Sequence, residues 1–86
     1  MEGCFRDRVF AVVRGIPPGS VLSYGDVARL AGNPRAARAA GSVLKTNYDL
    51  GVPCHRVICA DGRLGEYNRG AEKKRALLAE EGFLAQ

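Results

Sequence analysis

The 86-residue sequence contains no tryptophan, a single histidine and no long apolar run. A membrane-spanning helix needs about 20 consecutive apolar residues, and no segment of the chain approaches that length. The N-terminus, Met1-Glu2-Gly3-Cys4, lacks the basic and then apolar pattern of a signal peptide. These absences exclude a membrane protein and predict a cytoplasmic, intracellular one.

Disulfide and metal frameworks are also missing. Cys4, Cys54 and Cys59 are odd in number and form no Cys-x-x-Cys pair, which predicts free thiols in a reducing compartment. Structural zinc needs about four Cys or His ligands at characteristic spacings. The three cysteines and one histidine are scattered along the chain, so we expect no metal and no cofactor.

What the sequence does contain suits a small folded protein with a basic surface. It is 47% hydrophobic and 26% charged, with 13 Lys+Arg against 9 Asp+Glu and a formal net charge of +4. Its length predicts one domain over residues 1–86, with no N-terminal domain beside it. The positive charge favours a polyanionic partner.

The first part of the chain shows helical periodicity interrupted by a turn. Apolar residues recur at the spacing of an amphipathic helix, which we expect over residues 4–14. A Pro-Pro-Gly sequence at residues 17–19 cannot continue that helix. It predicts a rigid turn followed by a short extended segment at residues 20–22.

A helix-turn-helix pattern follows, at about residues 23–45. Ser23 and Asp26 resemble a capping box, which starts a helix over residues 24–31. A glycine ends it, and Asn33-Pro34 supplies an N-cap and a first helical residue for a second helix. Two helices across a tight glycine-containing turn are typical of a DNA-binding motif whose second helix recognises DNA.

The second helix is lined with alanine and glycine. Small side chains allow close approach to another surface, and Arg35 and Arg38 occupy neighbouring positions on one face. This pattern fits a helix that enters a DNA groove. It equally fits a packed helix with two solvated arginines, and the residues alone leave both interpretations open.

The stretch Pro53-Cys54-His55-Arg56-Val57 is the segment in which we expect the chemistry to take place. A thiol acts as a nucleophile only as thiolate, which a neighbouring base or cation favours. Consecutive side chains of a strand point to opposite faces, so Cys54 and His55 cannot touch in regular strand geometry. Pro53 favours a loop-to-strand junction. An inert buried cysteine beside a partly exposed histidine is the alternative.

The remaining segments predict a hairpin and a closing helix. Residues 56–59 form an expected strand within an active-site segment at 52–59, and Asp61-Gly62 is a strong hairpin turn signal in a loop or wing at 60–70. Helical periodicity resumes over residues 71–81, with Gly82 as C-cap. The expected fold is mostly α with a small β-hairpin.

Four segments taken together, residues 23–28, 32–39, 53–58 and 65–67, resemble the C-terminal DNA-binding domain of the O6-alkylguanine-DNA alkyltransferases (methylated-DNA–protein-cysteine methyltransferases). The resemblance covers nearly the whole chain and implies a winged helix-turn-helix fold. It implies a repair protein that binds the minor groove of double-stranded DNA and flips out a guanine alkylated on O6. The alkyl group would pass irreversibly to Cys54, in one turnover.

The resemblance also implies roles for individual residues. His55 acts as a base through a bridging water and is oriented by Glu81, with Asn47 nearby, while Tyr24 donates a proton to the flipped base. Arg38 fills the space that the base vacates. The other expected DNA contacts are Arg35, Ala36, Ala37, Gly41 and Lys45, and the expected base pocket consists of Tyr67, Asn68, Val57 and Pro53.

Two departures and two alternatives accompany the resemblance. Asn68 stands where many members carry serine, and Arg69 where others carry glycine or tryptophan. Alkyltransferase-like proteins, which share this size, replace the acceptor cysteine and bind lesions for excision-repair proteins without repairing them. Cys54 favours the transferase, expected as a monomer. A non-catalytic lesion sensor and a plain winged-helix regulator remain alternatives.

Overall fold

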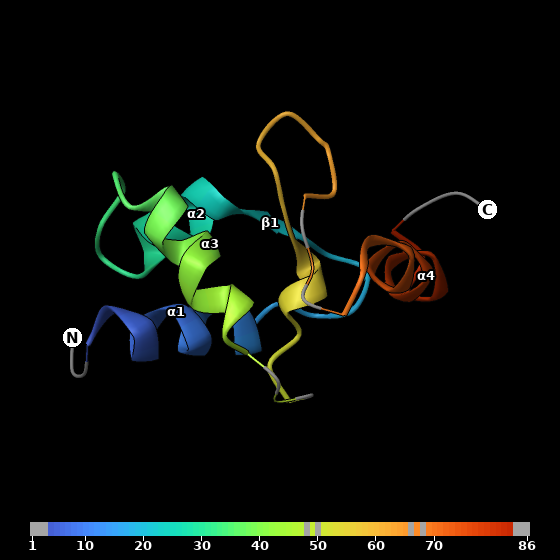
Figure 1. Cartoon of the computed structure of the whole chain (residues 1–86), viewed down its shortest axis with the longest axis horizontal. Helices are drawn as coiled ribbons and strands as arrows, with labels where there is room; N and C mark the ends of the chain where they lie inside the picture. Colours follow the sequence, from blue (N-terminus) through green and yellow to red (C-terminus); the bar gives the residue numbers. More distant parts are fainter. Residues whose placement is uncertain (1–3, 48, 50, 66, 68, 84–86) are drawn as a thin grey trace.

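The computed structural model describes residues 4–47, 49, 51–65, 67 and 69–83. Figure 1 shows the helices that precede residue 46 gathered at one end of the molecule and the C-terminal helix at the other end, with a short turn between them. The mostly helical fold is therefore confirmed. In chain order the elements are α1 (Phe5–Arg14), β1 (Leu22–Ser23), α2 (Tyr24–Leu30), α3 (Ala37–Lys45), the 3-10 helix η1 (Cys54–Arg56), β2 (Val57–Ile58) and α4 (Ala71–Glu80).

The helix-turn-helix part is built from α1, α2 and α3, which contact one another around an apolar core. The predicted capping box is confirmed: the Asp26 amide donates to Ser23 Oγ at 3.0 Å, and the Ser23 amide donates to the Asp26 carboxylate at 3.5 Å. It fixes the start of α2 and therefore the direction of Tyr24, the first residue of the helix. Residues buried in this core include Val9, Val13, Val27, Ala28, Ala31, Ala40 and Leu44.

The connection between α2 and α3 differs from the prediction. The Asn33 amide donates to the Ala28 carbonyl at 2.9 Å, which closes the C-terminus of α2. The Asn33 carbonyl accepts from the Ala36 amide at 3.0 Å, so residues 33–36 form a turn and α3 begins at Ala37. The expectation that Asn33-Pro34 starts the second helix is wrong, because the backbone of Asn33 already serves α2 and the turn.

The expected β-hairpin is also wrong, because the two strands pair in parallel. Leu22 lies opposite Val57, so β2 pairs with the extended segment that follows the Pro-Pro-Gly turn. The Asp61-Gly62 turn does form, and the Cys59 amide donates to the Arg63 carbonyl at 2.8 Å across it. The described residues between this turn and α4 contain no strand, so the segment is a loop.

The prediction of Gly82 as the C-cap of α4 is one residue off, because the C-cap is Glu81 and Gly82 follows it. Gly82 has a φ of +87°, and the Phe83 amide donates to the Leu78 carbonyl at 3.0 Å. This hydrogen bond closes the last turn in a conformation that favours glycine. Glu81 is therefore the C-cap residue of α4, an element that contacts η1.

Candidate active site

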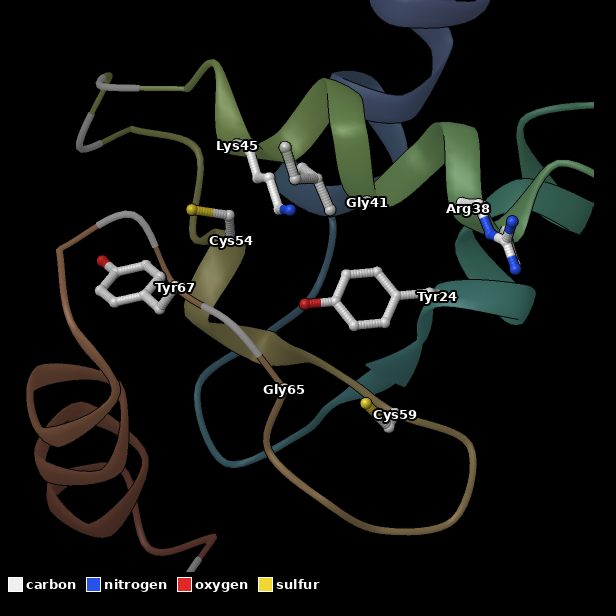
Figure 2. A pocket seen from close by; sticks show the side chains of 10 residues that line it. Tyr24, Arg38, Gly41, Lys45, Cys54, Cys59, Gly65 and Tyr67 are labelled. Atoms are coloured by element: carbon white, nitrogen blue, oxygen red, sulfur yellow. The ribbon is translucent and has the colours of Figure 1, made fainter.

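A pocket of about 390 Å³ opens between α3, the start of α2, η1 and the loop after β2. Figure 2 shows Cys54 and Tyr67 on one side of it and the Tyr24 ring projecting from α2, with its hydroxyl directed toward that side. The described residues that line the pocket include basic side chains and no acidic one. They are Tyr24, Ala37, Arg38, Gly41, Leu44, Lys45, Cys54, Cys59, Gly65 and Tyr67.

Cys54 is the first residue of η1 and is 5% exposed. The side-chain amide of Asn47, itself buried just after α3, donates to Cys54 Sγ at 3.4 Å and to the Val52 carbonyl at 3.1 Å. A donor directed at sulfur stabilises the thiolate relative to the thiol. The structure thus brings together Asn47 and Cys54, as the resemblance implied.

His55, the next residue of η1, is absent from the lining of the pocket and is paired with Glu81. His55 Nε2 is 2.8 Å from Glu81 Oε2. Hydrogen bonds from Arg56 hold the pKa of Glu81 at about 2, so this carboxylate is ionised at neutral pH and can only accept. The neutral imidazole therefore carries its proton on Nε2 and its lone pair on Nδ1. Hydrogen bonds among the described residues include none between Cys54 and His55.

The position of Tyr24 is set by two glycines. A Cβ atom at Gly65, where φ is +75°, would lie 3.2 Å from the Tyr24 hydroxyl and 3.2 Å from Cys59 Sγ. A Cβ atom at Gly41 on α3 would lie 3.8 Å from the Tyr24 ring. The loop backbone and α3 therefore approach the ring closely, and the space at Gly65 accepts no side chain without displacement of Tyr24 or Cys59.

Lys74 is a buried cation on α4. From the sequence alone we expect it among the charged residues outside the apolar stripe of that helix. It is 0% exposed, its Nζ donates to the Val57 carbonyl at 2.6 Å, and Nζ lies 5.7 Å from the centroid of the Tyr24 ring. Burial lowers the pKa of Lys74 to about 8, and negative charge on Cys54 and Cys59 acts in the opposite direction. A sequence signal existed: Lys74 lies four residues before the buried Leu78, on the same side of the helix.

The expected base-pocket residues are only partly together. Tyr67 lines the pocket and contacts the His55 ring edge-on at a centroid distance of 6.4 Å. The guanidinium of Arg69 lies 5.9 Å from the Tyr67 ring centroid and donates to its hydroxyl at 3.2 Å. Pro53 is half-buried and Val57 fully buried, and neither lines the pocket. Asn68 lies outside the described residues.

The expected DNA contacts follow one side of α3. Ala37, Arg38, Gly41 and Lys45 line the pocket (Figure 2), while Arg35 is exposed in the preceding turn and Ala36 is the N-cap residue. Within the described part of the chain, no three His, Cys, Asp or Glu side chains cluster as a metal site requires. None of the described helices has the length and apolar character of a membrane span.

Residues 4–83 match the family model for the 6-O-methylguanine DNA methyltransferase, DNA binding domain. The chain belongs to this family. Human methylated-DNA–protein-cysteine methyltransferase is 42% identical over 82 residues, which are 94% of this chain and 40% of the human protein. The chain therefore spans less than half the length of that relative. The resemblance inferred from four short segments is confirmed.

Two solved structures with a similar fold contain DNA. Mycobacterium tuberculosis OGT in complex with DNA is similar with a TM-score of 0.88 and 43% identity, over 95% of this chain and 51% of that one. S. pombe Atl1 in complex with damaged DNA containing O6-carboxymethylguanine gives a TM-score of 0.81 and 36% identity, over 91% and 75%. These similarities confirm a helix-turn-helix fold of the alkyltransferase type.

Proposed function

We propose that this chain repairs DNA by transferring the alkyl group of an O6-alkylguanine irreversibly to Cys54. The observation that carries the proposal is the position of Cys54: its thiol lines a pocket beside α3 and lies within 3.4 Å of the Asn47 amide, while the adjacent His55 is paired with Glu81. An inert buried cysteine needs none of these neighbours. The family and the DNA complexes of its members support DNA as the partner.

The proposed reaction uses these groups in sequence. The thiol proton passes through a water to His55 Nδ1, and the Cys54 thiolate attacks the alkyl carbon in line with the C–O6 bond. The S–C bond forms as the C–O6 bond breaks, and its electron pair stays with the guanine. Tyr24 gives its proton to the departing base, so guanine leaves neutral. The product thioether has no easy reverse path, so each molecule acts once.

A cation supports both negative charges that arise in this reaction. Lys74 is buried beneath the Tyr24 ring and interacts electrostatically with Cys54. Its ammonium favours the thiolate before transfer and the Tyr24 phenolate after it.

Delivery of the base rests on α3. The small residues Ala37 and Gly41 allow this helix to lie deep in the minor groove, and Arg38 is exposed beside the pocket. Insertion of Arg38 into the base stack would fill the space of the flipped guanine. Lys45 lines the pocket and can pair with a phosphate.

The direct experiment mixes the protein with a duplex that contains one O6-methylguanine. We expect a mass gain of one CH2 per protein molecule on the peptide that carries Cys54, and an equal amount of restored guanine. Cys54→Ser should bind the same duplex and gain no mass. An unmodified Cys54 in the folded, DNA-bound protein contradicts the proposal.

The second candidate function is a lesion sensor without transfer chemistry, which the similarity to S. pombe Atl1 over 75% of that chain favours. A sensor would keep its affinity for alkylated DNA after many equivalents of substrate, with Cys54 unmodified, and would pass the lesion to excision-repair proteins. A plain regulator would bind guanine and alkylguanine duplexes equally. Loss of binding with rising salt is common to all three and separates none of them.

A further inference from the structure

The Glu81 carboxylate serves two partners at once. Arg56 Nε donates to Oε1 at 2.9 Å and Arg56 Nη2 donates to Oε2 at 2.7 Å, while His55 Nε2 lies 2.8 Å from the same Oε2. The three side chains are 10–15% exposed, so water screens their charges little. The imidazole therefore shares a carboxylate whose charge is already matched by a guanidinium.

Arg56 cannot easily leave this arrangement. Its Nη1 donates to the carbonyl of Ile16 at 2.8 Å, on the segment that follows α1, so the guanidinium is held by two separate parts of the chain. Glu81 is fixed in turn as the C-cap residue of α4. The charge of Arg56 consequently stays at a constant position relative to the His55 ring.

The titratable and charged groups that face His55 come from three elements. Cys54 and Arg56 belong to η1, Glu81 caps α4, and Tyr67 contacts the ring from the loop. The negative charge of Glu81 and the positive charge of Arg56 offset each other beside the ring. With Glu81 alone, the carboxylate would favour the imidazolium, which cannot accept a proton.

We propose that Arg56 is a positioning residue for the base: it shares the Glu81 carboxylate with His55 and so limits how strongly that carboxylate favours the imidazolium, with Nε2–H on Glu81 and Nδ1 as the proton acceptor. The use of this base in alkyl transfer rests on the proposed function. The state of the ring does not, because it can be measured on the free protein without DNA.

The chain has one histidine, so a ¹⁵N NMR titration reports on His55 without ambiguity. The neutral ring of the unsubstituted protein should show a protonated Nε2 and a bare Nδ1. Arg56→Met should raise the midpoint of the ring titration by about one pH unit, about tenfold in proton affinity. Glu81→Gln should lower the midpoint, because the imidazolium then loses its carboxylate.

Controls separate charge from structure. Arg63→Met removes an exposed arginine that is also paired with a carboxylate, Asp61 at 2.7 Å, and should leave the midpoint unchanged. Arg56→Lys keeps the positive charge and should shift it by much less than Arg56→Met. If Arg56→Met does not fold, Arg56→Gln, which is neutral but still donates, must show the rise. An unchanged or lower midpoint in a folded neutral variant overturns the proposal.

Discussion

The two sides of η1 are electrically different. On the pocket side, Cys54 has the buried ammonium of Lys74 nearby and a described lining without a carboxylate. On the opposite side, the positive charge of Arg56 is matched by Glu81, and the His55 ring is held between them and Tyr67. Cys54 therefore lies in an environment of net positive charge, whereas the charges around His55, the next residue, cancel.

This difference assigns separate tasks to neighbouring residues. A net positive environment favours the thiolate and costs stability, because a buried charge loses its hydration. The Arg56–Glu81 ion pair stabilises the fold, and it orients the His55 ring without strongly favouring the imidazolium. The predictions that follow alter one side at a time.

Gly65→Ala should give the largest effect, on the pocket side. The new Cβ atom meets the Tyr24 hydroxyl and Cys59 Sγ at 3.2 Å, and φ is +75°. Left-handed strain and overpacking together should lower the free energy of unfolding by about 3 kcal/mol. Gly62→Ala is the matched control, since φ is +94° but no atom lies within 4 Å. It should cost only about 1 kcal/mol in the same denaturant titration.

Glu81→Gln should remove an acid-sensitive part of the stability on the compensated side. The pKa of Glu81 falls from 4.5 to about 2 in the folded protein, chiefly through hydrogen bonds from Arg56. A depressed carboxyl pKa stabilises the fold above pH 4.5, and this contribution disappears as pH falls toward 2. We expect about 2 kcal/mol to be lost over that window. Chemical denaturation from pH 6 downward should show a flatter profile for Glu81→Gln; an equally steep profile contradicts the assignment.

Lys74→Met should have a smaller effect on stability, and of opposite sign. The folded pKa of Lys74 is about 8 against 10.5 when solvated, so the unfolded chain binds more protons between these values and stability rises with pH. Lys74→Met should abolish that rise and increase the free energy of unfolding at pH 7 by about 1 kcal/mol. Lys73→Met, at the exposed neighbouring position, is the control and should retain the rise. A Lys74→Met protein that is less stable at pH 7 would count against a costly buried charge.

The helix-turn-helix part could be predicted from local patterns. Apolar spacing located α1, and the Ser23–Asp26 capping box located α2, because these signals act between residues a few positions apart. The predicted start of α3 was wrong because one residue, Asn33, fits two competing patterns. A good N-cap residue is also well suited to the turn that closes the preceding helix.

The active-site arrangement depends on contacts between residues that are far apart in the sequence. Glu81 and Arg56 are 25 residues apart, and Arg56 reaches the carbonyl of Ile16 across 40 residues. The parallel pairing of β1 with β2 is equally remote, and local turn chemistry suggested a hairpin instead. The family resemblance supplied the site residues Asn47, His55 and Glu81, but neither Arg56 nor Lys74. Their roles became visible only through burial and hydrogen bonding.

The most direct test of the two-sided account is the pH dependence of the Cys54 reaction with iodoacetamide, followed by peptide mass mapping. Exposed Cys4 in the same molecule serves as an internal reference. We predict that Lys74→Met raises the pH of half-maximal Cys54 reactivity by about one unit, while Lys73→Met leaves it unchanged. Identical profiles for the two variants would contradict the claim that the pocket side is charged to support the Cys54 thiolate.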